Sequence, residues 1–263
     1  MKNEKEQQQC EPTVEEIIEF LESSSDFSFE MAVLHQINRL GFQCSHAGTY
    51  SDPITSKVRQ YDIRALKQNK NHCLHLSIEC KNLSEAAPLL VHTTSRSSSE
   101  SYHYLFFRSK DMMVASPRLE EASTLYPDGR AVGKKLDLLR RDQNGKLKGK
   151  DEEVFERLNQ AQNSAYHLIQ AGAMSTQSDL IQGVVPILVI PDDTLWCVDY
   201  SVLGDRSYPQ RAKEVSFFIG QEVPLLGPYH TGQSFHLSHI EIVTFSWIAR
   251  RISSLMELIS IGD

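Results

Sequence analysis

"LHLSIECKNL", residues 74–83, places two opposite charges, Glu79 and Lys81, at the end of an otherwise apolar run. A short apolar run of this kind predicts a buried β-strand. Side chains alternate between the two faces of a strand, so Glu79 and Lys81 point to one face while Leu76 and Ile78 point to the other. Two explanations are open: a salt bridge facing solvent on an edge strand, or a functional site on a buried strand.

The residues before this strand predict a tail, two helices and two more strands. Residues 1–12 are expected to be a disordered tail, and Thr13 with Glu16 makes a capping box that opens a short helix. A second helix is expected over 27–40, ending at Gly41. The strand-like runs are "GFQCSHA" (41–47), "YDIRAL" (61–66) and "CLHLSIEC" (73–80).

The residues after this strand complete a single α/β domain over 13–263. Residues 84–150 mix apolar runs with serine-rich and basic stretches, and we interpret them as an insertion. A long helix is expected over 151–172, followed by two strands within 183–200 that are joined at the turn "PDD". An extension from about residue 201 carries another strand and a final amphipathic helix.

Composition limits the class of protein. The chain has 263 residues, enough for a core without disulfides, and its five cysteines form no CxxC pair, so a reducing, cytoplasmic setting is expected. No apolar run approaches the ~18–20 residues that cross a bilayer, and the N-terminus is polar where a signal peptide would be apolar. We therefore expect no membrane partner.

Charge is unevenly distributed along the chain. A net charge of −7 argues against a nucleic-acid-binding surface over the whole molecule, because phosphates are attracted by clustered lysine and arginine. Residues 134–150 differ, with seven basic residues against two acidic ones. This segment either touches phosphate or forms a solvated loop.

Glu30 is a carboxylate on a predicted apolar helix face. In the helix over 27–40 it lies near the centre of a stripe made of Phe27, Val33, Leu34, Ile37 and Leu40. Burying an unpaired carboxylate is costly. Glu30 therefore either meets a cation or caps the start of the helix beside Asp26.

Asp62 supplies another carboxylate at the opening of a strand. Its neighbours Ile63 and Ala65 point to the opposite face, so Asp62 can join the polar face that holds Glu79 and Lys81. Carboxylates that converge beside a lysine suit a hard divalent cation, since Mg²⁺ prefers carboxylate oxygens and retained waters.

The order of these residues resembles that of the PD-(D/E)xK nuclease superfamily: a helix glutamate (Glu30), an aspartate opening a strand (Asp62), and Glu-x-Lys on the next strand. The last element is Glu79-Cys80-Lys81, and the resemblance covers roughly residues 26–83. It implies a restriction-endonuclease-like α/β/α core, a central mixed sheet flanked by helices. It also implies that Asp62, Glu79 and the carbonyl of Cys80 ligate Mg²⁺, for which Mn²⁺ substitutes, and that Glu30 binds the ion directly or through water.

The long helix carries a second resemblance. Gln162 and Tyr166 are similar to the Gln-x-x-x-Tyr element of the RecB-like branch of that superfamily, which implies that they orient Lys81 or a phosphate. Gln162 lies in an apolar stripe, so its amide needs a partner, either in the site or on nearby backbone. Lys81 would position and help deprotonate the attacking water.

Two functions from different classes follow. The first is an Mg²⁺-dependent nuclease that hydrolyses phosphodiester bonds, with DNA favoured over RNA. A defence or restriction system is one setting for such an enzyme, and a homodimer is the arrangement common among enzymes that cut duplexes. The second is an inactive module of the same fold that binds nucleic acid or a partner protein.

Other metal and nucleophile sites are disfavoured. Cys73 and His75 share one face of their strand and Cys80 the other, which argues against a zinc site there. His230, His236 and His239 are expected to be scattered surface and cap residues. The sequence holds no nucleophile elbow and no glycine-rich phosphate loop.

Overall fold

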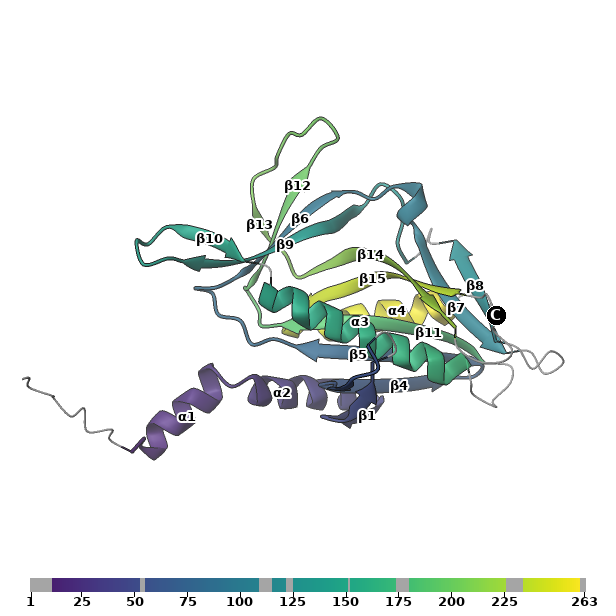
Figure 1. Cartoon of the computed structure of the whole chain (residues 1–263), viewed down its shortest axis with the longest axis horizontal. Coiled ribbons are helices and arrows are strands. Elements are labelled where there is room, and N and C mark those ends of the chain that lie inside the picture. The colour runs from purple at the N-terminus through teal and green to yellow at the C-terminus, as the bar shows by residue number, and fades with distance from the viewer. Residues whose placement is uncertain are drawn as a thin grey trace, which may run out of the picture.

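One large mixed sheet organises the molecule (Figure 1). The computed structural model describes residues 11–52, 55–108, 115–121, 125–150, 152–173, 180–225 and 234–260. Within these residues the sheet has 13 strands, with neighbours in the order β1-β4-β5-β11-β15-β14-β9-β6-β12-β13; β10 also pairs with β9, and β7 pairs with β11 and β8. The strands are β1 (Gln43–His46), β4 (Ile63–Asn69), β5 (His72–Cys80), β6 (Leu89–Ser95), β7 (Tyr102–Arg108), β8 (Ala115–Glu121), β9 (Ala131–Arg141), β10 (Leu147–Lys150), β11 (Ile181–Ile190), β12 (Leu195–Tyr200), β13 (Gln210–Arg211), β14 (Glu214–Pro224) and β15 (Ser234–Thr244).

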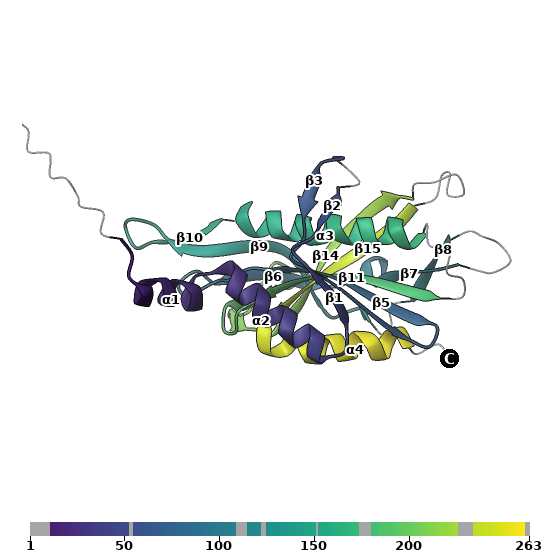
Figure 2. The same ribbon diagram turned by 90° about the horizontal axis from the view of Figure 1, so that it is seen from below.

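Helices cover both faces of this sheet. Figure 2 shows α3 (Glu152–Ala173) on one face, with α2 (Asp26–Arg39) and α4 (Ile248–Ser260) on the other. The remaining helical elements are α1 (Val14–Ser23) and the short 3-10 turns η1 (Ser98–Glu100) and η2 (Phe245–Trp247). The expected α/β class, a large mixed sheet flanked by helices, is therefore confirmed.

β5 is a central strand, which excludes the edge-strand interpretation of its charges. It pairs antiparallel with β4 and parallel with β11. The apolar residues of β5 enter a core with α2 and α4. On the other face, Ser77 Oγ donates a hydrogen bond to the carbonyl of Ala161 in α3 at 2.9 Å. The alternation read from "LHLSIEC" thus separates an apolar face from a polar face that contacts α3.

A small second sheet stands beside α3. β2 (Thr49–Ser51) and β3 (Val58–Gln60) form an antiparallel pair. Tyr50 is buried, and its hydroxyl donates to the carbonyl of Gln160 in α3 at 3.4 Å. Local sequence patterns do not indicate this pair, because its strands are three residues long and their other side chains are exposed.

Several local predictions are confirmed. The capping box is present, with Glu16 N–H donating to Thr13 Oγ1 at 3.2 Å and Thr13 N–H donating to Glu16 Oε2 at 2.7 Å. α2 and α3 lie within one residue of the expected ranges, and the expected final helix is present as α4. Gly41 follows α2 with a φ of 79°, which glycine adopts without strain. The expected tail falls mostly on residues 1–10, which lie outside the described residues.

Two long segments are integrated into the sheet. Residues 84–150, expected as an insertion, supply β6 to β10, and β7 pairs with β11. The extension from residue 201 supplies β15, which pairs parallel with β11 and antiparallel with β14 in the middle of the sheet. Among the described residues, no helix has the length and apolarity needed to cross a membrane.

Candidate functional site

Asp62 and Glu79 are held together at the ends of two neighbouring strands. The pairing of Ile63 with Ile78 places Asp62, just before β4, beside Glu79 near the end of β5. Asp62 Oδ2 accepts a hydrogen bond from the backbone N–H of Cys80 at 2.8 Å, and Glu79 Oε1 accepts one from the backbone N–H of Asp62 at 3.4 Å. Both residues are buried, at 7% and 0% exposure. Backbone contacts of this kind fix the two carboxylates relative to each other.

The surroundings of Asp62 and Glu79 disfavour a negative charge on Glu79. Burial raises the pKa of Glu79 well above its usual range, the charge of Asp62 raises it further, and Arg157 opposes this. Glu79 Oε2 is buried and has no hydrogen-bond partner among the described residues. A buried acceptor without a partner is costly, so this oxygen is suited to receiving a cation or a donor from a ligand.

Glu30 lies close enough for Asp62 to act on it. Burial first, and then the charge of Asp62, raise the pKa of Glu30, while a contact with His46 lowers it. Glu30 Oε2 lies 3.2 Å from His46 Nε2 on β1. The structure therefore gathers Glu30, Asp62 and Glu79 in one neighbourhood, with Glu30 turned to β1 rather than bonded to the other two acids.

Lys81 and Glu79 both face α3, as the strand alternation predicted. Lys81 Nζ lies 3.0 Å from Glu153 Oε1 in the first turn of α3 and 3.4 Å from Asp26 Oδ2 at the start of α2. Asp26 Oδ1 also accepts a hydrogen bond from the backbone N–H of Asn82 at 3.1 Å. Lys81 is thus held between the starts of two helices at the rim of the acid pair.

Arg157 is the residue that the sequence interpretation missed. Its Nη1 lies 3.9 Å from Asp62 Oδ1 and 3.7 Å from Glu79 Oε2, and its Nη2 lies 3.7 Å from Asp26 Oδ2. Glu153 and Arg157 are four residues apart, and Ala161 is four further on, so they share the α3 face that contacts β5. That spacing was a signal for this contact, but the sequence prediction used the apolar stripe that contains Gln162, and this stripe does not include Arg157.

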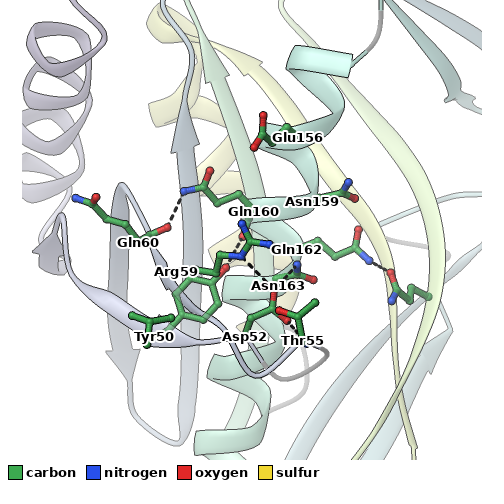
Figure 3. A pocket seen from close by; sticks show the side chains of 12 residues that line it. Tyr50, Asp52, Thr55, Arg59, Gln60, Glu156, Asn159, Gln160, Gln162 and Asn163 are labelled. Carbon is green, nitrogen blue, oxygen red and sulfur yellow. Dashed lines mark hydrogen bonds and ion pairs between the residues drawn. The ribbon is translucent and has the colours of Figure 1, made fainter.

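Gln162 and Tyr166 lie apart from this cluster. Gln162 Nε2 donates to Tyr166 Oη at 2.6 Å and also to Oε1 of Gln221 on β14. Within the described residues, no hydrogen bond or ion pair joins either one to Lys81 or to the three acids. The partners of the Gln162 amide are therefore side chains, and Gln162 lines a neighbouring cavity (Figure 3).

The carboxylates of the site are of the type that binds a hard divalent cation, but in the structure an arginine lies beside them. Carboxylate oxygens of Asp62, Glu79 and Glu30 are the ligands that Mg²⁺ prefers. In the part of the chain that the structure describes, no group of three His, Cys, Asp or Glu side chains is arranged to hold a metal ion. Arg157 Nη1 instead lies 3.9 Å from Asp62 Oδ1 and 3.7 Å from Glu79 Oε2.

Cys80 and His239 are both buried, which limits Cys80 to a backbone role and corrects the prediction for His239. The side chain of Cys80 is buried in the core shared with α2 and α4, on the face away from Glu79, so only its backbone can serve the site. The expectation that His239 is a surface or cap residue is wrong, because His239 is buried and its ring stacks on Tyr126 with centroids 3.8 Å apart. His230 lies outside the described residues.

Comparison with known proteins gives no match, whether to a protein-family model, to a curated protein or to a solved structure.

Proposed function

We propose that the protein is an Mg²⁺-dependent nuclease that hydrolyses phosphodiester bonds, with DNA as the favoured substrate. The observation that carries the proposal is the buried pair of Asp62 and Glu79, fixed through backbone hydrogen bonds, with Lys81 two residues further along and facing the same helix. A carboxylate pair beside a lysine is the donor set of a divalent cation and a nucleophilic water.

The order of elements supports a restriction-endonuclease-like core as part of this proposal. A helix with Glu30 precedes β1, β4 and β5, which are neighbouring antiparallel strands with the pair β2–β3 inserted between β1 and β4. After β6 to β10 come α3, on one face, and β11, which is parallel to β5. This is a central mixed sheet flanked by helices, with the acids at the ends of β4 and β5. The described cysteines Cys44, Cys73, Cys80 and Cys197 are all free, which supports a reducing setting.

The proposal requires Arg157 to move away from Asp62 and Glu79 when a metal ion binds. A guanidinium at 3.7 and 3.9 Å from two buried carboxylate oxygens is near enough to offset their charge, but beyond ordinary hydrogen-bond length. Asp26, also 3.7 Å from Arg157, offers an alternative partner nearer solvent, with 34% of its side chain exposed. We therefore expect Arg157 to be the counter-ion of the metal-free protein and to move toward Asp26 or a substrate phosphate when a divalent ion binds.

The roles of the chain's own residues follow from their positions. A divalent ion, when bound, supplies Lewis acidity at the phosphate and lowers the pKa of a water molecule. Asp62 and Glu79 would hold that ion through Oδ1 and Oε2, the two oxygens that Arg157 approaches. Lys81 would leave Asp26 or Glu153 to orient the attacking water, and Arg157 would stabilise charge on the phosphate in the transition state.

The basic segment lies next to this site, which supports a polyanionic substrate. Residues 134–150 form β9, β10 and the turn between them, a hairpin that extends from the sheet beside the start of α3 (Figure 1). Arg140 Nη2 lies 2.7 Å from Glu153 Oε2, and the other oxygen of Glu153 contacts Lys81. Clustered positive charge at the rim of an acidic site attracts phosphates to a protein of net negative charge.

An inactive binding module is the second candidate, and Arg157 is the observation that favours it. If its ion pairs with Asp62 and Glu79 are permanent, the acids serve to pair with an arginine and not to hold a metal. In that case the hairpin β9–β10 would carry nucleic-acid binding without cleavage.

Cleavage assays separate the two candidates. The purified chain is incubated with supercoiled plasmid, linear duplex, single-stranded DNA and RNA in Mg²⁺ or Mn²⁺, beside Lys81→Ala and Asp62→Asn. We expect the wild type to cut and both variants to lose at least about a hundredfold in rate, as is usual when a positioned catalytic group is removed. Arg211→Ala, an exposed arginine that pairs with Glu85, should cut like the wild type. A wild type that cuts none of the substrates supports the binding module, and variants that cut at the wild-type rate refute this site.

A further inference from the structure

A cavity of about 510 Å³ lies between the hairpin β2–β3, the outer side of α3 and β14 (Figure 3). It is distinct from the acid pair, and its lining is unusually rich in amides. The residues that line it are Tyr50, Asp52, Thr55, Val58, Arg59, Gln60, Glu156, Asn159, Gln160, Gln162, Asn163 and Gln221.

Asp52 contacts Thr55, Asn163 and Arg59 and so holds one side of the cavity together. Its side chain is buried, and its Oδ1 accepts a hydrogen bond from the backbone N–H of Thr55 at 3.0 Å. Its Oδ2 accepts a hydrogen bond from Asn163 Nδ2 at 3.1 Å and lies 3.7 Å from Arg59 Nε. Because the amino group of Asn163 is used by Asp52, the carbonyl oxygen of Asn163 remains to accept a hydrogen bond from a ligand.

Gln160 and Gln162, like Asn163, use their amino groups in hydrogen bonds within the protein. Gln160 Nε2 donates to the carbonyl of Gln60 at 2.6 Å, and Gln162 Nε2 donates to Tyr166 Oη and to Gln221 Oε1. Within the described residues, the amide carbonyls of Gln160 and Gln162 accept no hydrogen bond and the amino group of Gln221 donates none, so they can serve a ligand as acceptors and as a donor. These carbonyl acceptors beside the amino group of Gln221 suit a ligand group that carries an amino group beside a ring acceptor.

The charges of the cavity disfavour a phosphate as its occupant. Two carboxylates, Asp52 and Glu156, line it against one guanidinium, Arg59. An anion placed there would meet a net negative wall. An uncharged, planar group with several hydrogen-bonding positions meets no such penalty.

The cavity adjoins the proposed catalytic acids. Tyr50 lines the cavity and lies near enough to Glu79 for that charge to raise its pKa, after the larger effect of burial. Gln60 lies two residues before Asp62, and Glu156 precedes Arg157 on α3. A group bound in the cavity would thus keep the chain to which it is attached beside the acid pair.

We infer that this cavity binds one unpaired nucleobase that carries an exocyclic amino group, so that the protein prefers single-stranded segments with adenine, cytosine or guanine over thymine or uracil. Amide side chains read base edges through paired donors and acceptors. The inference deepens the proposed nuclease function and rests on it for the identity of the ligand as nucleic acid.

Binding without cleavage tests this inference. The wild-type chain in EDTA is titrated into fluorescein-labelled single strands of deoxycytidine, deoxyadenosine or deoxythymidine, and fluorescence polarisation gives each Kd. We expect about tenfold tighter binding of the cytidine and adenosine strands than of the thymidine strand, the discrimination typical of one paired amide contact. Asn163→Ala and Gln221→Ala should reduce this preference to less than about twofold. Gln43→Ala, an exposed amide on β1, should leave it unchanged.

The outcomes distinguish this inference from the proposed nuclease. Equal binding of all three strands by the wild type overturns the base pocket, even if Lys81-dependent cleavage is observed. A preference that survives both cavity variants, when their melting curves match the wild type, also overturns it. A preference that the variants abolish supports the pocket even if no cleavage occurs in any metal, because EDTA removes catalysis from the measurement.

Discussion

At the residue scale, Glu79 combines complete burial, a like-charged neighbour and an oxygen, Oε2, that has no hydrogen-bond partner among the described residues. Its pKa in the folded protein lies above its ordinary value of 4.5. Between these two values the folded protein keeps a proton that the unfolded chain has released. The contribution of Glu79 to stability therefore falls as the pH rises through that window.

Glu79→Gln should remove this pH dependence. In EDTA we expect the Tm of the variant, relative to wild type, to increase on going from about pH 5 to about pH 8, because the wild type alone must charge a buried carboxylate. Differential scanning calorimetry measures the difference. The same substitution at exposed Glu257 serves as a control, and a Glu79→Gln difference that is constant across this range would show that the carboxylate is not strained in the folded state.

Arg157 tests whether a cation and an arginine compete for the same oxygens. Arg157→Ala should lower the Tm in EDTA, because it leaves two buried acids without their positive partner, and should increase the rise in Tm on adding Mn²⁺. Arg211→Ala is the matched control for loss of one arginine. A smaller response to Mn²⁺ in Arg157→Ala than in wild type would mean that Arg157 supports the ion rather than competing with it.

At the element scale, the hairpin β9–β10 is the basic feature nearest the site. Lys146 and Lys150 on this hairpin are exposed, and neither forms an ion pair with another described residue. If both contact phosphates, Lys146→Ala with Lys150→Ala should reduce the slope of log K against log salt by about 1.4 for single-stranded DNA. Lys213→Ala, near β13, should not change the slope. Polarisation titrations at several salt concentrations give the slopes, and an unchanged slope in the double variant would remove the hairpin from the interface.

Element prediction from the sequence succeeded where periodicity was local. The capping box of Thr13 and Glu16, the helices α2, α3 and α4, and the alternation of β5 all follow from spacing alone. The strand pair β2–β3 was not predicted, because its strands are short and mostly exposed. The apolar stripe of α3 is buried at Gln162, Ala165 and Ile169, but it does not include Arg157, which lies on the adjoining face toward β5.

At the scale of the whole molecule, sequence order and spatial order diverge. β15, near the C-terminus, lies between β11 and β14, and β6 pairs with β12 more than a hundred residues later. Pairings of this range depend on the complete set of strands, so local patterns could not predict them. The neighbourhood of Glu30, Asp62 and Glu79 was predictable, because it depends on one helix and one hairpin that are close in sequence.

The most direct test of the central claim is a titration of the whole chain with Mn²⁺, followed by electron paramagnetic resonance of the free ion. The account predicts that the wild type takes up Mn²⁺ and that both Asp62→Asn and Glu79→Gln bind it at least about tenfold more weakly, because each loses one charged ligand. Uptake by both variants equal to that of the wild type, or no uptake by the wild type, would contradict it.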